Sequence, residues 1–402
     1  MNAKQLVSAA PMQSTSGVRV PVAHRVHDVP LPKTPQGAIM AHNPPGIRRR
    51  TYRPAASIRA ISLRKPSDEA DLMKTISSVC ATALLACSLA AAEAPTWSST
   101  LPKYDHILIV VEENKDYEQI IGNKGAPYIN MLATEGANFT RMFGEEHPSE
   151  GNYFWLFSGN NQNVGFEDQV SSRKFSASSL GEQLIKKRLS FIGYSESLPA
   201  IGFEADVTPP KCRYPCIYGR KHVPWISFAA IPNGATIDTS SNLRFVDFPS
   251  DYTKLPTVAF VIPNMENDMH NGAPKDSVPA GDRWLRENLD GYYQWAKTHN
   301  SLLILTFDEN DDKGGYRGLT DPSVSPDHDQ SRHDRQNRIA TVFAGAHVKA
   351  NYAEPNSMTH VNLLRTIEAI YALPKSGAQQ ANALRAGISD DAIATDLFVP
   401  VQ

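Results

Sequence analysis

Ser149 lies in a polar turn that could do chemistry, His147-Pro148-Ser149-Glu150-Gly151-Asn152-Tyr153, and this turn runs directly into the apolar segment 154–157. The pattern places Ser149 just ahead of a buried helix or in its first turn. The free N–H groups and the dipole at such a helix start attract anions. A serine hydroxyl there could attack a phosphate held by the same helix end. The alternative is that Ser149 only caps the helix, with Asn152 a polar residue in its first turn.

Acid-rich clusters follow three apolar runs, each of which reads as a buried strand. The pairs are Glu113-Asn114 after residues 106–111, Asp268 and His270 after residues 257–262, and Asp308-Glu309 after residues 301–307. If the strands are parallel, these clusters converge on one edge of the sheet, where sites gather in open α/β folds. The alternative for each cluster is an acidic surface loop.

Several carboxylates in one place repel one another unless a cation lies among them. Hard oxygen ligands favour a divalent metal ion, which could also bind the Ser149 hydroxyl, lower its pKa and screen a phosphate. The arrangement does not suggest a Ser-His-Asp triad, because the chain has no G-x-S-x-G motif.

Alternating strands and helices must position these residues, which predicts an α/β fold. Besides the three strands above, we expect strands at 137–140, 191–194 and 338–345, and helices at 126–135, 150–158, 178–188, 282–299 and 360–371. Residues 196–250 read as an irregular excursion over the site. This excursion carries basic side chains able to meet an anionic substrate, namely Arg213, Arg220, Lys221 and His222.

The chain has 402 residues and a net charge of −2, which argues against nucleic acid or an anionic membrane as the main partner. Residues 1–72, rich in Pro, Ser, Ala and Arg, read as a disordered or spurious N-terminal extension. Residues 73–94 read as a signal peptide: Met73-Lys74, a short apolar run, and small residues at Ala90 and Ala92. We therefore expect translation to start at Met73 and the protein to be secreted or periplasmic, with residues 95–402 as the catalytic domain.

The cysteines agree with export. Cys212 and Cys216 remain in the mature chain, and their spacing in an oxidising compartment predicts a small disulfide loop. A zinc site would need two more ligands nearby, and His222 is one candidate without a second. Leu84-Leu85-Ala86-Cys87 resembles a lipoprotein cleavage box, so anchoring at Cys87 is the less favoured alternative. No transmembrane helix is expected in the mature chain.

Five blocks in order resemble the phosphoesterase family of secreted acid phosphatases and bacterial phospholipases C, a branch of the alkaline-phosphatase superfamily. They are HILIVVEENKDYEQIIG from His106, HPSEGNYFWLFSG from His147, LPTVAFVIPNMENDMHNG from Leu255, WAKTHNSLLILTFDEN from Trp295 and HVNLLRTIEAIYAL from His360. The resemblance implies a three-layer α/β/α sandwich with a mostly parallel central sheet, alkaline-phosphatase-like in form.

The resemblance also implies roles for particular residues. The predicted metal ligands are Glu113, Asn114, Ser149, Asp308 and Glu309, where Glu309 departs from the aspartate frequent in relatives. Ser149 is the predicted nucleophile, and Asp268 and His270 hold the phosphate or protonate the leaving group. The residues expected to bind substrate are His147, Asn152 and His360, the last at the place of a late histidine that binds metal in two-metal relatives.

Together these features predict an exported acid phosphatase that depends on a divalent metal ion and forms a phosphoserine intermediate. The first alternative is a phospholipase C-type phosphodiesterase, acting on a phospholipid headgroup rather than a small phosphorylated substrate. The second is a catalytically inactive secreted binding protein, against which the Glu113, Asn114, Ser149 and Asp308 set speaks. The metal identity, the pH optimum and the oligomeric state are open.

Overall fold

The computed structural model describes residues 97, 101–164, 174–208, 217–311 and 337–399, all within one compact unit, Leu85–Gln402. The extension at 1–72, the signal peptide at 73–94, and Cys212 and Cys216 lie outside the described residues. Within the described part of the chain, no helix is long and apolar enough to span a membrane.

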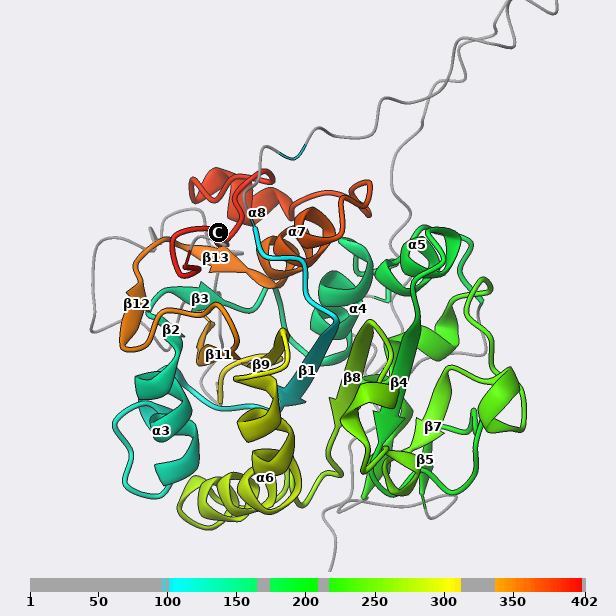
Figure 1. Cartoon of the computed structure of the whole chain (residues 1–402), viewed down its shortest axis with the longest axis horizontal. Helices are drawn as coiled ribbons and strands as arrows, with labels where there is room; N and C mark the ends of the chain where they lie inside the picture. Colours follow the sequence, from blue (N-terminus) through cyan, green and yellow to red (C-terminus); the bar gives the residue numbers. More distant parts are fainter. Residues whose placement is uncertain (1–96, 98–100, 165–173, 209–216, 312–336, 400–402) are drawn as a thin grey trace, which may run out of the picture. The chain divides into compact units, whose positions relative to one another are not determined.

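An eight-stranded sheet forms the centre of this unit, in the order β12-β2-β11-β9-β1-β8-β4-β7 (Figure 1). Its strands are β1 (His106–Glu112), β2 (Ala137–Phe139), β4 (Phe191–Ser195), β7 (Asn242–Arg244), β8 (Val258–Ile262), β9 (Ser301–Phe307), β11 (Thr341–Gly345) and β12 (Tyr352–Glu354). Strand β11 runs antiparallel to both of its neighbours, while the other seven strands of this sheet run in one direction.

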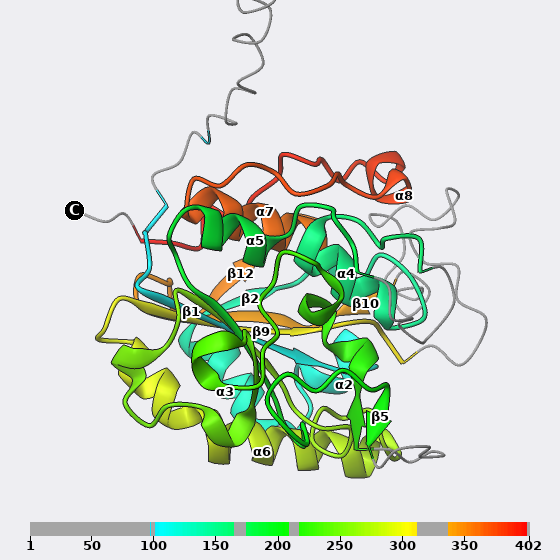
Figure 2. The same cartoon turned by 90° about the vertical axis from the view of Figure 1, so that its right-hand side faces the viewer.

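Helices cover both faces of the sheet (Figure 2). One face carries α4 (Glu150–Ser158), α5 (Leu180–Lys186) and α7 (His360–Ile370). The other carries α2 (Tyr117–Ile120), α3 (Pro127–Glu135) and α6 (Pro274–Ala296). The predicted three-layer α/β/α sandwich with a mostly parallel sheet is confirmed.

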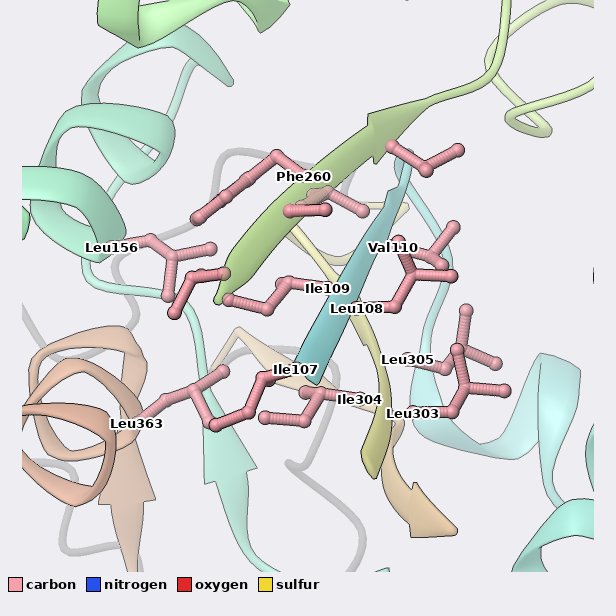
Figure 3. Packing of buried hydrophobic residues seen from close by; sticks show 14 of the residues in the cluster. Ile107, Leu108, Ile109, Val110, Leu156, Phe260, Leu303, Ile304, Leu305 and Leu363 are labelled. Atoms are coloured by element: carbon pink, nitrogen blue, oxygen red, sulfur yellow. The ribbon is translucent and has the colours of Figure 1, made fainter. Parts of the chain in front are cut away.

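The core is built by the alternation of side chains along the central strands. Ile107 and Ile109 of β1 point toward Leu156 of α4 and Leu363 of α7, whereas Leu108 and its neighbours on that side point the opposite way (Figure 3). All of these side chains are buried. Burial of each side chain contributes about 1.5–3 kcal/mol to folding, so the strands that carry the site are anchored in the core.

Small elements complete the unit. A second sheet has the order β10-β3-β13, and β5 pairs with β6. These short elements are β3 (Met142–Phe143), β5 (Val207–Thr208), β6 (Tyr218–Gly219), β10 (Arg338–Ile339), β13 (Met358–Thr359), α8 (Ala381–Arg385), η1 (Arg220–His222), η2 (Pro224–Ser227), η3 (Ile237–Thr239), η4 (Phe245–Asp247) and η5 (Tyr252–Lys254).

Two sequence-based boundaries and one expectation of irregular structure were wrong. The strand expected at 338–345 divides at Ala340 into β10 and β11, which belong to different sheets. Helix α6 begins at Pro274 rather than at 282, because proline is tolerated in the first turn and the helix continues through Pro279. The excursion at 196–250 contains an edge strand of the main sheet, β7.

Candidate active site

The acid-rich strand ends converge as predicted. Strands β1 and β9 are paired in parallel up to Glu112 and Phe307, and β8 pairs with β1 on its other side. The backbone N–H of Asn114 donates to Asp308 Oδ1 at 3.0 Å, and that of Asp308 donates to the Glu112 carbonyl at 3.0 Å. The residues after the two strands therefore share one position at the sheet edge.

Ser149 occupies the N-cap position of α4, but its side chain makes no capping hydrogen bond. Its backbone is helical, with φ −35° and ψ −51°. The hydroxyl instead lies within donating distance of two carboxylates, Glu113 Oε2 at 3.1 Å and Glu309 Oε1 at 3.3 Å. A hydroxyl has one proton, so it donates to one of them at a time. Ser149 therefore does not cap α4 through its side chain, and its hydroxyl faces the two carboxylates instead.

Asn152, one turn further along α4, shapes the loop before the serine. Its Oδ1 accepts from the backbone N–H groups of Glu145 and Glu146, at 2.9 and 3.0 Å. Its Nδ2 donates to Glu309 Oε2 at 3.3 Å. Asn152, a predicted substrate-binding residue, is therefore fully buried and hydrogen-bonded to Glu309, a predicted metal ligand.

His147 lies at the same carboxylate and is partly exposed. Its Nδ1 is 3.1 Å from Glu309 Oε1, and its Nε2 is 2.9 Å from Asn310 Oδ1. The peptide bond between His147 and Pro148 is cis. The His147 imidazole and the Ser149 hydroxyl thus both contact the same oxygen of Glu309.

Two further side chains bind Glu113 from the side away from Ser149. His222 Nε2 lies 3.0 Å from Glu113 Oε1, and the Tyr153 hydroxyl donates to the same oxygen at 2.6 Å. The two rings stack, with centroids 5.1 Å apart and an angle of 13° between their planes. His222 also lies 3.5 Å from Asp268 Oδ2 through its Nδ1. A buried histidine therefore bridges two of the predicted site acids.

The charges explain how this buried group is tolerated. Burial alone would lower the pKa of His222, but Glu113 and Asp268 raise the pKa of the imidazole to about 10. Burial would likewise raise the pKa of Glu113, yet the charge of His222 holds that pKa well below its ordinary value. Burial dominates at Asp268, whose pKa is raised. His222 and Glu113 thus form a charged, buried pair next to Asp268.

Asp268 and His270 lie on the His222 side of the site. Asp268 is fully buried, and its Oδ1 accepts from the backbone N–H of His270 at 2.8 Å. The His270 ring is half-buried, with its centroid 6.0 Å from that of His222. Asp268 therefore orients its neighbours, and His270 is the member of this pair that is accessible to solvent.

His360 is buried next to the end of β9. Its ring nitrogens lie 2.6 Å from Glu145 Oε2 and 2.8 Å from the Phe307 carbonyl oxygen. The side chain is 1% exposed. Substrate binding by His360 would require one of these buried bonds to break, so the geometry gives the residue a different place from the one predicted.

The predicted metal ligands supply the kind of oxygen atoms and the negative charge that a divalent cation prefers. Burial raises the pKa of Asp308 well above its usual range, and Glu113 and Glu309 raise it further. Asp308 Oδ2 is buried without a hydrogen-bond partner among the described residues. A divalent ion would relieve this crowding and use the free oxygen. In the described residues, however, no group of three or more His, Cys, Asp or Glu side chains is arranged so that it could hold a metal ion.

Sequence reasoning missed the role of Tyr153 and gave His222 only a general one. Tyr153 lies four residues after Ser149 on α4, a spacing that places both on one helix face and could have identified it. His222 sits in η1, within the excursion whose path depends on tertiary contacts. No local sequence signal predicts that this histidine reaches Glu113.

Known proteins similar to this chain include enzymes that cleave phosphate esters. A phosphatidylinositol-3-phosphatase from Mycobacterium tuberculosis is 40% identical over 281 residues, which cover 70% of this chain and 81% of that protein. A probable acid phosphatase from Kluyveromyces lactis is 26% identical, and an acid phosphatase from Aspergillus fumigatus is 25% identical. These alignments cover 70% and 66% of this chain, and 61% and 54% of the fungal proteins.

Among solved structures, a protein of the alkaline phosphatase superfamily from Vibrio parahaemolyticus aligns with 73% of this chain and 71% of its own, at a TM-score of 0.47 and 10% identity. The model of the Phosphoesterase family matches residues 123–374, which include Ser149 and Asp308 but begin after Glu113. The alternative of a catalytically inactive binding protein is not supported, since the named relatives above are phosphatases. The chain belongs to the Phosphoesterase family and is a hydrolase of phosphoric esters.

Proposed function

We propose that this protein is an exported, metal-dependent phosphatase of the acid phosphatase type that uses Ser149 as its nucleophile. The observation that carries the proposal is the direction of the Ser149 hydroxyl. Although Ser149 lies at the start of a buried helix, its hydroxyl makes no capping bond and points to Glu113 and Glu309. A carboxylate at that distance can accept the hydroxyl proton as the oxygen attacks.

The reaction runs in two steps. Ser149 Oγ attacks the phosphorus in line and gives its proton to a neighbouring carboxylate, while the bond from phosphorus to the ester oxygen breaks. His270, half-buried near His222, protonates the departing alcohol. In the second step His270 takes a proton from the water that attacks phosphorus. The carboxylate returns its proton to Ser149 Oγ as the bond from phosphorus to that oxygen breaks, and inorganic phosphate leaves.

The residues proposed to hold the metal are Glu113, Asn114, Ser149, Asp308 and Glu309. A divalent ion bound there would lower the pKa of the serine hydroxyl and screen the charge of the phosphate. We expect a chelator to abolish hydrolysis and added divalent ions to restore it. Full activity in a metal-free preparation would contradict this part of the proposal.

Replacement of the nucleophile tests the proposal directly. Ser149→Ala is expected to lower the hydrolysis of an aryl phosphate by roughly 10³-fold or more, since removal of a nucleophile leaves only the contribution of binding and charge. The matched control is Ser158→Ala, because Ser158 is also buried on α4 but its hydroxyl donates to the Phe154 carbonyl. Near wild-type activity of Ser149→Ala would refute the nucleophile.

The substrate is proposed to be a phosphomonoester, on the support of relatives named as acid phosphatases and as a phosphatidylinositol-3-phosphatase. A phospholipase C-type diesterase is the alternative. A chromogenic phosphomonoester assayed beside a phosphocholine diester separates them, and faster cleavage of the diester would favour the alternative. A phosphoinositide monophosphate in the same panel tests for a lipid substrate.

Export through residues 73–94 is proposed from the sequence alone. When a chain begun at Met73 is expressed, N-terminal sequencing of the exported protein should find a start near residue 95. A lipid-modified Cys87 at the mature N-terminus would favour the lipoprotein alternative, and retention of the uncleaved segment in the cytoplasm would contradict export.

A further inference from the structure

His360 forms a buried bridge between two segments that meet at the site. One ring nitrogen, Nδ1, lies 2.6 Å from Glu145 Oε2, and the other, Nε2, lies 2.8 Å from the Phe307 carbonyl oxygen. All three residues are fully buried or nearly so. Such a bridge is therefore shielded from the water that weakens polar contacts at the surface.

The partners determine where the protons are. A carbonyl oxygen can only accept, so Nε2 of His360 carries a hydrogen and donates it to Phe307. Nδ1 of His360 and Oε2 of Glu145 face each other at hydrogen-bonding distance. The other oxygen of Glu145 accepts from the backbone N–H of Val361 at 3.0 Å, at the N-terminus of α7, where a negative charge is favourable. Contacts at both nitrogens thus fix the ring in position.

Both partners of His360, Phe307 and Glu145, belong to segments that carry residues of the site. Phe307 directly precedes Asp308, and its carbonyl lies beyond the pairing of β9 with β11, which begins at Thr306 and Thr341. The same carbonyl also accepts from Thr306 Oγ1 at 3.4 Å, a longer contact than the 2.8 Å to His360. Glu145 belongs to the loop that leads to Ser149, and its backbone N–H donates to Asn152 Oδ1.

We propose that His360, held by Glu145, is a positioning residue that sets the place of the Asp308–Glu309 acids relative to the Ser149 loop. It does so through the Phe307 carbonyl, without contact to substrate. The inference rests on the proposed function, because it matters for catalysis only if Ser149 and these acids perform the reaction.

Two amide replacements separate the two halves of the bridge. The amide of His360→Gln reaches about as far as Nε2 and retains a donor to Phe307, whereas that of His360→Asn reaches only as far as Nδ1. We expect His360→Asn to lower kcat about 10- to 100-fold, as small displacements of reacting groups do. His360→Gln should return kcat to within about threefold of wild type.

The constants for binding separate positioning from substrate contact. In both variants the KM for an aryl phosphate and the inhibition constant of inorganic phosphate should stay within about twofold of wild type. The reason is that His360, as proposed, does not contact the substrate, so its replacement removes no binding interaction. A rise in both constants with kcat retained would overturn the proposal in favour of direct substrate binding.

Glu368→Ala, which leaves a cavity and removes the carboxylate beside Arg365, is the matched control for a purely structural effect. Glu368 lies two turns further along α7, is equally buried and pairs with Arg365 at 2.8 Å, away from Phe307. It should lower the midpoint of urea unfolding without changing kcat. If His360→Asn behaves in the same way, with reduced stability and an unchanged kcat, the positioning role is refuted.

Should His360→Asn fail to fold, Glu145→Ala removes the other end of the bridge and should give the same loss of kcat at constant KM. An unchanged kcat in Glu145→Ala would overturn the proposal. The failure of the proposed function remains distinguishable: near wild-type activity of Ser149→Ala would refute the nucleophile, whereas an inactive Ser149→Ala beside a fully active His360→Asn would refute only the bridge.

Discussion

Glu112 and Glu113 are neighbours in the sequence and both are fully buried, but they point to opposite faces of the sheet. Glu113 faces α4, where Ser149, Tyr153 and His222 contact it. Glu112 faces the α6 side, and within the described residues neither of its oxygens has a hydrogen-bond partner. Burial raises the pKa of Glu112 well above its usual range, while His222 holds that of Glu113 below it.

Glu368 shows the intermediate case. It is buried to the same degree but pairs with Arg365 and accepts from the backbone N–H of Ser376. Burial raises its pKa to about 7, less than it would without that arginine. The three glutamates share burial and differ in their partners, so the partners decide which acid stays ionised and able to take part in chemistry.

The largest expected effect comes from replacing Glu113 and Glu112 by glutamine in two separate variants. Glu113→Gln removes a proposed metal ligand and proton acceptor, and should lower kcat/KM for an aryl phosphate by about 10²- to 10³-fold. Glu112→Gln keeps the size of a buried side chain on the opposite face of the sheet from Ser149 and should leave kcat/KM within about threefold of wild type. Equal losses in both variants would contradict the division between the two faces.

Removal of His222 should leave Glu113, like Glu112, buried without a positively charged partner. His222→Gln leaves Glu113 and Asp268 without their buried cation, and breaking such a pair lowers the free energy of unfolding by about 3–5 kcal/mol. Urea unfolding at pH 7 measures this loss. His347→Gln is the control, since the His347 ring contacts the Asn300 amide rather than a carboxylate. Equal stability of the two variants would refute the paired charge.

The smallest effect concerns the pH dependence of stability through Glu368. Its pKa is 4.5 in the unfolded chain and about 7 in the folded one. Between these values only the folded state holds the proton, so stability is greatest below pH 4.5 and declines as the pH rises to 7. The shift corresponds to about 3 kcal/mol. Glu368→Gln should flatten this part of the unfolding profile, and an unchanged slope would show that another group is responsible.

Much of this arrangement follows from sequence patterns. The apolar runs before Glu113 and Asp308 are too continuous for half-exposed strands, so they predict buried parallel strands whose ends converge. The polar turn before residue 154 predicts the start of α4. These local signals bring together Glu113, Asn114, Ser149, Asp308 and Glu309, and the structure places them as neighbours.

Other features depend on tertiary contacts that no local pattern contains. An apolar run does not reveal its direction, so β11 could not be predicted as the antiparallel strand. Alternation shows that Glu112 and Glu113 point apart, but not which one meets the helix with the serine. His222 arrives from the excursion, and the partners of His360 lie 215 and 53 residues away. Their roles follow from packing.

The most direct measurement of the central claim is chemical trapping of the covalent intermediate. The enzyme is mixed with excess aryl phosphate, quenched in acid within milliseconds, digested and mapped by mass spectrometry. The account predicts a phosphorylated peptide with the phosphate on Ser149, absent from Ser149→Ala. Phosphate on a different residue, or full turnover by Ser149→Ala, would contradict it.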